Sequence, residues 1–157
     1  ELSKVQFAVV LYRMEGSPEV SLSANTLSIP ENAYYAPAVF WADQTGLLDG
    51  FRTASIKPED QITREEMITM LFRYFLNLLT YHYQKKSTPS PQEMAKILGI
   101  NPYFMKDYTE GAKRYNAMKC ANIISFLREY DLKSKGVGNA NISDGQLLRE
   151  LIFKIMH

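Results

Sequence analysis

The chain has 157 residues, 46% hydrophobic and 22% charged, which suits a globular protein of one ordinary domain or two small ones. The net charge of +1 is unevenly distributed: residues 1–70 hold 5 basic and 10 acidic side chains, whereas residues 71–157 hold 13 and 7. This difference indicates two parts with different partners. A lone cysteine, Cys120, excludes an intrachain disulfide, and no stretch approaches the ~18 apolar residues of a membrane span.

Two segments of the sequence resemble each other in character. Residues 2–13 read LSKVQFAVVLYR, and residues 62–73 read ITREEMITMLFR. Each has a hydroxyl residue suited to cap a helix, a basic residue in the first turn and then an apolar stripe at helical spacing. A repeat with this long period predicts a modular architecture rather than a single enzyme core.

The sequence of the N-terminal part predicts two short helices joined by loops. Ser3 caps the first helix, over residues 3–15, and Gly-Ser-Pro ends it. The second helix covers residues 34–45, with Pro37 in its first turn. Residues 47–61 form a compact loop before the next capping residue.

A long helix is predicted to begin at Thr63. Glu66 follows three residues later, which is the capping-box pattern, and no stop signal occurs before Ser-Thr-Pro at 87–89. The helix therefore covers residues 63–84, beyond the usual ~10–14 residues. Four more helices follow, over residues 91–98, 101–113, 116–133 and 143–156. Residues 63–157 thus predict five helices and no strand.

Residues 34–75 resemble an S-layer homology repeat. The segment holds a paired aromatic, an alanine-rich helix with a tryptophan, a glycine-bounded turn, a Pro-Glu-Asp segment and a Thr-Arg helix start. Residues 2–17 look like the tail of a preceding repeat. The resemblance implies non-covalent binding of cell-wall polysaccharide in a bacterial envelope.

That resemblance implies four carbohydrate-binding residues. Arg64 would contact an acidic sugar substituent beside the free backbone N–H groups of a helix start, an arrangement that favours anions. Lys4 holds the matching position of the first copy, and Trp41 and Tyr35 would form apolar walls. The alternative for Arg64 is an exposed first-turn residue with no ligand.

Residues 71–157 resemble a different family, the C-terminal domain of the delta subunit of bacterial DNA polymerase III. The matching elements are Glu-Met-Ala with Leu-Gly-Ile at 93–100, Ala-Lys-Arg-Tyr at 112–115, and the terminal leucine stripe. The details are most similar to the Bacteroidetes version. The resemblance implies a helical collar piece of a cytoplasmic clamp loader, with other clamp-loader subunits as partners and no catalysis.

Apolar stripes in the C-terminal helices agree with an assembly role. One stripe, at 3.6-residue spacing, holds Leu147, Leu148, Leu151, Ile152 and Ile155. Such stripes are usually core, but a bundle of this size can only just bury all of them. The candidate subunit-interface residues are Leu147, Leu151, Phe153 and Phe104.

The sequence gives less support to DNA reading, phosphate binding or catalysis. Residues 91–113 have the outline of a helix-turn-helix, yet the second helix offers Tyr103 and Phe104 rather than base-reading side chains, which favours a structural hairpin. The loop 133–139 could hold a phosphate, but it lacks P-loop spacing and is better explained as a helix C-terminus with lysines. The sequence indicates no catalytic set, no metal site and no cofactor, and sequence-specific DNA contact is not expected.

Together these observations predict a mostly α protein. Partial S-layer-type helices in residues 1–70 would join, through a long shared helix, a five-helix collar-type bundle in residues 71–157. Such a chain is an apparent chimera. Its primary predicted function is non-catalytic assembly of a clamp loader in DNA replication, and the alternative is wall-polysaccharide binding in the cell envelope through residues 1–75. The N-terminal half of the long helix should pack on residues 5–14 and 38–42, and its C-terminal half on residues 123–127 and 147–155.

Overall fold

The computed structural model describes residues 2–20, 29–48, 56–87, 90–138 and 143–157, with the backbone alone at 144 and 145. Within these residues the regular structure is helical, apart from one isolated bridge between Ser3 and Gln61. The helices are α1 (Lys4–Met14), α2 (Ala36–Gln44), α3 (Arg64–Gln84), α4 (Pro91–Leu98), the 3₁₀ turn η2 (Pro102–Phe104), α5 (Met105–Arg114), α6 (Ala117–Ser134) and α7 (Asp144–Met156). The prediction of a mostly helical protein is confirmed.

Hydroxyl side chains begin four helices where the sequence predicts them, Ser90 of α4 among them. Thr63 accepts a hydrogen bond from the backbone N–H of Glu66, whose carboxylate accepts one from the backbone N–H of Thr63. The same capping box begins two other helices: Ser3 with Gln6, and Ser143 with Gln146. These bonds satisfy donors that a first turn leaves unpaired, so the starts of α1, α3 and α7 are encoded locally.

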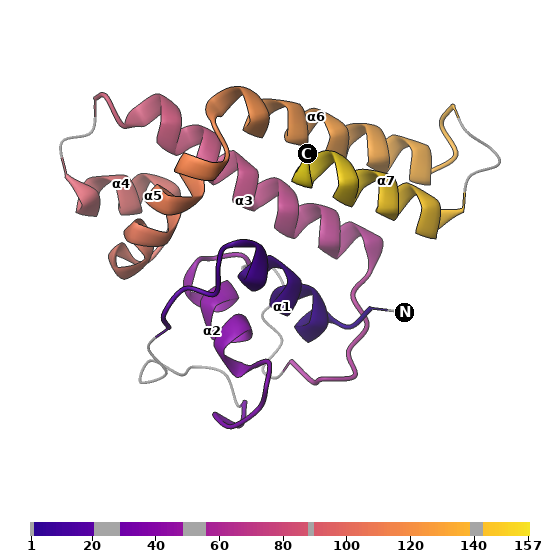
Figure 1. Cartoon of the computed structure of the whole chain (residues 1–157), viewed down its shortest axis with the longest axis horizontal. Helices are drawn as coiled ribbons and strands as arrows, with labels where there is room; N and C mark the ends of the chain where they lie inside the picture. Colours follow the sequence, from indigo (N-terminus) through magenta and orange to yellow (C-terminus); the bar gives the residue numbers. More distant parts are fainter. Residues whose placement is uncertain (1, 21–28, 49–55, 88–89, 139–142) are drawn as a thin grey trace.

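The long helix α3 is continuous and lies at the centre of the molecule (Figure 1). Helix α6 packs along it in the opposite direction. Arg64, in the first turn of α3, donates to the carbonyl of Ser134 at the end of α6, at 2.9 Å. His82, near the end of α3, lies 2.8 Å from the carbonyl of Tyr115, just before α6. At each end of the α3–α6 pair, a side chain of α3 therefore contacts a backbone carbonyl at the corresponding end of α6.

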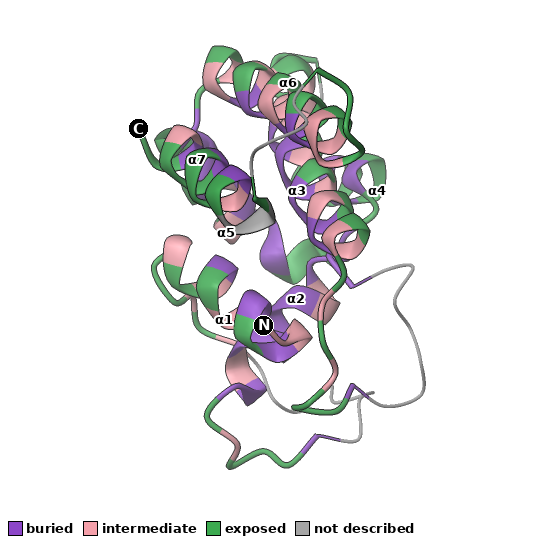
Figure 2. Ribbon diagram, turned by 90° about the vertical axis from the view of Figure 1, so that its right-hand side faces the viewer, coloured by how far each residue is buried: buried purple, intermediate pink, exposed green. Residues whose placement is uncertain are grey.

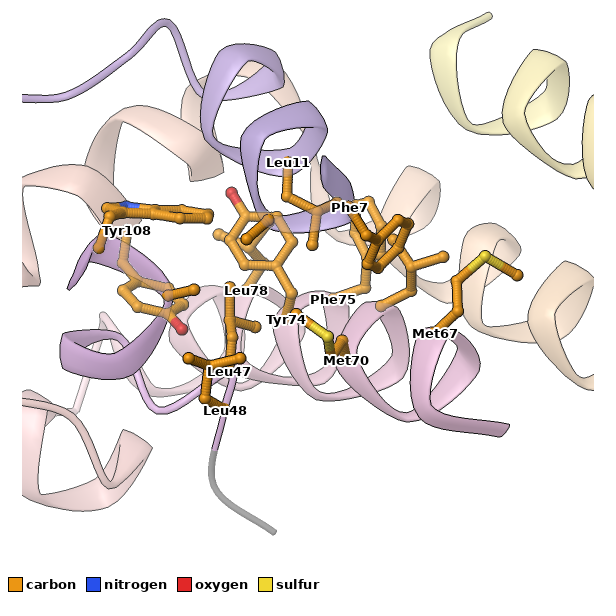
Figure 3. Packing of buried hydrophobic residues seen from close by; sticks show 14 of the residues in the cluster. Phe7, Leu11, Leu47, Leu48, Met67, Met70, Tyr74, Phe75, Leu78 and Tyr108 are labelled. Atoms are coloured by element: carbon orange, nitrogen blue, oxygen red, sulfur yellow. The ribbon is translucent and has the colours of Figure 1, made fainter. Parts of the chain in front are cut away.

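The N-terminal helices cover another side of α3 and share its core. The rings of Trp41 in α2 and Tyr74 in α3 lie 6.4 Å apart, and the Tyr74 ring lies 5.9 Å from Tyr108 in α5. The hydroxyl of Tyr108 donates to the carbonyl of Thr45 at 3.2 Å. Figure 3 shows Phe7 and residues of α3 facing one another within this cluster, and the buried residues line the inward faces of the helices in Figure 2. Buried side chains from both parts of the chain thus form one hydrophobic cluster.

Two details differ from the sequence-based predictions. The helix predicted over 101–113 is instead a 3₁₀ turn followed by α5, because Asn101 caps a tight turn that Phe104 closes by an i to i+3 bond. The prediction that α7 lies beside the C-terminal half of α3 is wrong. Its residues Leu148, Ile152 and Ile155 share a groove with Met67 and Leu71, which belong to the N-terminal half of α3. Because α6 runs antiparallel to α3, the chain returns to the start of α3 before α7 begins.

The predicted division between residues 1–70 and 71–157 falls inside α3. The helix has no break near that position. The two-part organisation stays a prediction.

Candidate subunit interface

One face of α7 anchors it to the core and leaves the opposite face exposed. Leu147, Leu151 and Ile155 are buried at helical spacing, and they pack in the same cluster as Ile123 and Leu127 of α6. Because these residues face the core, the residues on the opposite side of α7 face the solvent. Phe153 is accordingly 62% exposed and Met156 60% exposed.

The exposed face of α7 borders a hollow of about 470 Å³ against α6. We call this feature the α6–α7 hollow; it is lined by Asn116, Met118, Lys119, Asn122, Ile123, Phe126, Phe153, Lys154 and His157. Met118 is 71% exposed, which is unusual for a large apolar side chain. Apolar residues exposed together in this way are typical of a protein–protein contact surface.

The charged groups in the α6–α7 hollow are basic. The ammonium of Lys154 lies 4.9 Å from the centre of the Phe126 ring, and that of Lys119 lies 5.4 Å from the Tyr115 ring. Lys154 also pairs with Glu150 at 2.9 Å, one turn earlier on α7. Because none of the lining residues is acidic, the hollow suits a partner surface that is apolar at its centre and acidic at its edge.

The residues predicted for a subunit interface have different positions in the structure. Leu147, Leu151 and Phe104 are buried inside the chain, and only Phe153 is exposed. Sequence reasoning did not single out Met118. Met118 lies in the first turn of α6, outside the stripe of residues that this helix buries. An apolar residue outside such a stripe is the sequence signal that could have identified it.

The residues predicted for carbohydrate binding do not form an open groove. Trp41 is 1% exposed, and Tyr35 is also buried, so both rings are covered by the protein's own side chains. The guanidinium of Arg64 is engaged by the carbonyl of Ser134, and Lys4 pairs with Glu66 at 2.7 Å. The structure therefore gives each of these four residues a role within the fold, and carbohydrate binding stays a prediction.

A polar cluster that the sequence did not predict lies between the end of α1 and α5. Glu15 is buried, and its carboxylate lies 3.8 Å from the guanidinium of Arg114, which also donates to the carbonyl of Met14 at 2.9 Å. Burial raises the pKa of the Glu15 carboxyl, while Tyr74 and Arg114 act in the opposite direction. The cluster joins α1 to α5 by charge-assisted contacts.

The same cluster borders a cleft of about 430 Å³ that contains Asp107. Burial raises the pKa of Asp107 to about 6, against the opposing influence of Lys106. A carboxyl with a raised pKa can act as a general acid or base. Here Asp107 lines the cleft together with Glu15, and its partial burial in the fold accounts for the raised pKa.

Other chemical possibilities find no support in the described part of the chain. Within it, no group of three or more histidine, cysteine or carboxylate side chains could hold a metal ion, and no helix is long and apolar enough to cross a membrane. The cysteine Cys120 is buried, and burial raises its pKa to about 11. The lysines of the 133–139 segment pair with acidic residues of α6, Lys133 with Glu129 and Lys135 with Asp131.

A comparison with protein families identifies the class. The family model for the DNA polymerase III delta subunit, C-terminal domain, matches residues 58–154. This match covers more than half of the 157 residues, so the chain belongs to that family. It includes all of α3 and most of α7, and it leaves α1 and α2 outside.

Two further comparisons found no relative: no curated protein and no solved structure matches the chain. The resemblance of residues 1–75 to S-layer homology repeats, and with it the apparent chimera, has no support from the findings.

Proposed function

We propose that this chain is a non-catalytic assembly domain of a clamp-loader delta-like subunit in bacterial DNA replication. The family match over residues 58–154 carries this proposal. The other clamp-loader subunits are the proposed partners, and the cytoplasm is the proposed location. Direct reading of a DNA sequence is not part of the proposed role.

The α6–α7 hollow is the surface that we assign to this assembly. Met118 and Phe153 are the two most exposed large apolar side chains that line it, and both belong to the family-matched region. Large apolar and aromatic side chains of this kind carry much of the binding energy at subunit contacts. Basic side chains at the edge of the hollow would orient the partner.

The test is co-elution of the full chain with purified clamp-loader subunits from the same organism. Phe153→Glu combined with Met118→Glu should weaken the association by about tenfold or more, because it places charge at the centre of the contact. Both side chains are exposed, so the variant should remain folded. The matched control is Tyr34→Glu, an exposed aromatic residue outside the family-matched region.

Two outcomes would contradict the proposal. If the chain fails to co-elute with any clamp-loader subunit, the assembly role is wrong. If it co-elutes and the double variant binds as well as the control, the role stands and the assigned surface is wrong.

A further inference from the structure

A second apolar groove, of about 480 Å³, lies between α1 and α7 and is also lined by residues of α3. Three helices contribute side chains at helical spacing: Phe7, Val10, Leu11 and Met14 from α1, Met67 and Leu71 from α3, and Leu148, Ile152 and Ile155 from α7, together with Leu2. All ten lining residues are apolar. Figure 2 shows α1 and α7 on the same side of α3.

The two walls of this α1–α7 groove reach the surface. Val10 on α1 is 42% exposed and Ile152 on α7 is 40% exposed, although Leu11 and Ile155 beside them are buried. The groove is therefore open along the edge between the two helices. Its contacts repeat at intervals of three, four and seven residues on each wall, which is the spacing by which one helix recognises another.

Each wall of the opening carries an exposed arginine. Arg13 follows Val10 by three residues on α1, and Arg149 precedes Ile152 by three residues on α7, so each arginine is a neighbour of the exposed apolar residue on its own helix. Both arginines are exposed. Among the described residues, neither guanidinium has an acidic partner within ion-pair distance.

We propose that the α1–α7 groove binds an amphipathic helix of a partner protein that carries acidic residues beside its apolar stripe. The apolar stripe would fill the groove over Met67 and Leu71, and the carboxylates would pair with Arg13 and Arg149. Because α1 lies outside the family-matched region, this site goes beyond the proposed assembly role and does not depend on it.

The experiment measures binding of a fluorescent helical peptide to the full chain by anisotropy. The probe is about four turns long, with leucines at intervals of three and four residues and glutamates beside them. A second peptide has the same composition with the spacing scrambled, and a third has lysines in place of the glutamates. We expect saturable binding of the first peptide alone, weakening as salt is added.

Variants at exposed positions locate the peptide. Val10→Glu and Ile152→Glu should each weaken binding by about tenfold, because each removes apolar contact and adds a charge of the wrong sign. The matched control is Leu132→Glu, an equally exposed apolar residue on α6 that does not line the groove. Circular dichroism of each variant verifies that the chain is folded.

Reversing the charge of the two arginines tests whether they pair with the carboxylates of the peptide. The double variant Arg13→Glu with Arg149→Glu should lose the acidic peptide and gain the lysine peptide. Equal binding of the scrambled peptide, or binding unaffected by Val10→Glu and Ile152→Glu, would overturn the proposal. Binding of oleate micelles or anionic vesicles without binding of the acidic peptide would overturn it as well, because the groove would then be a lipid site.

Discussion

Gly111 of α5 lies directly against the side chain of Tyr74 in α3. A Cβ atom at position 111 would stand 2.7 Å from the Tyr74 hydroxyl oxygen and 3.1 Å from Oε2 of Glu15. The absence of a side chain therefore lets α5 approach both α3 and the end of α1. This one position connects the family-matched bundle to the N-terminal helices.

Gly111→Ala should destabilise the protein, although alanine is the better helix former. Helix propensity alone favours alanine by about 1 kcal/mol, but forcing a methyl group into a packed site costs about 1–3 kcal/mol. We expect a net loss in the free energy of unfolding, measured by urea denaturation.

A second substitution tests the cause of that loss. In the background of Tyr74→Phe, which removes the hydroxyl oxygen, Gly111→Ala should cost less than it does in the wild-type chain. An equal cost in both backgrounds would show that the contact with Tyr74 is not the reason.

The polar cluster beside Gly111 predicts a dependence of stability on pH. Burial raises the pKa of Asp107 from 3.8 to about 6, so between about pH 6 and pH 4 the folded chain binds a proton that the unfolded chain largely lacks. The free energy of unfolding should therefore rise as the pH falls from about 7.5 to about 5. Glu15, whose pKa burial also raises, acts in the same direction.

Asp107→Asn isolates this effect. The variant should be more stable than the wild-type chain near neutral pH and should show a flatter dependence between about pH 7.5 and 5. Thermal melts at several pH values measure it, with Glu59→Gln, an exposed carboxylate outside the cleft, as the control. A steep wild-type dependence that persists in the Asn variant would assign the proton to another group.

Local signals in the sequence predicted the helices well. Thr63 with Glu66 and Ser143 with Gln146 have their bonding partners within one turn, so the start of a helix can be read without the rest of the fold. The φ of Gly99 is 67°, a left-handed conformation that glycine adopts easily, and it ends α4 where the sequence predicts.

Contacts between distant segments were harder to predict. Glu15 and Arg114 are far apart in the chain, and no local pattern in either segment pairs them. The apolar stripe of α7 identified a helix with one buried face, but periodicity alone does not say which neighbour covers it, so Leu147 and Leu151 were expected at a subunit interface and instead belong to the core. The exposure of Phe153 follows only once that packing is fixed.

Arg64 supplies a test at the other end of the α3–α6 pair. Its hydrogen bond to the carbonyl of Ser134 closes the pair, so Arg64→Ala should lower the free energy of unfolding by about 1 kcal/mol. Arg128→Ala, at an exposed position on α6, should have little effect in the same urea titration. An unchanged stability for Arg64→Ala would show that this hydrogen bond does not stabilise the pair.

The whole chain should unfold as one cooperative unit. Trp41 is the single tryptophan and Cys120 the single cysteine, so each reports on one part: Trp41 on α2, and Cys120 on α6. Both are buried in one hydrophobic cluster that passes through Tyr74. Tryptophan fluorescence and thiol labelling should therefore show the same urea midpoint, because a shared core unfolds cooperatively.

Labelling kinetics add an independent measure of the same transition. The thiol of Cys120 should react much more slowly in the folded chain than in urea, because the side chain is fully buried and burial also raises its pKa to about 11. Two clearly separated midpoints, with Trp41 exposed while Cys120 is still protected, would instead support two independent modules divided within α3. A single midpoint would make α1 and α2 part of the folding unit to which the family-matched helices belong.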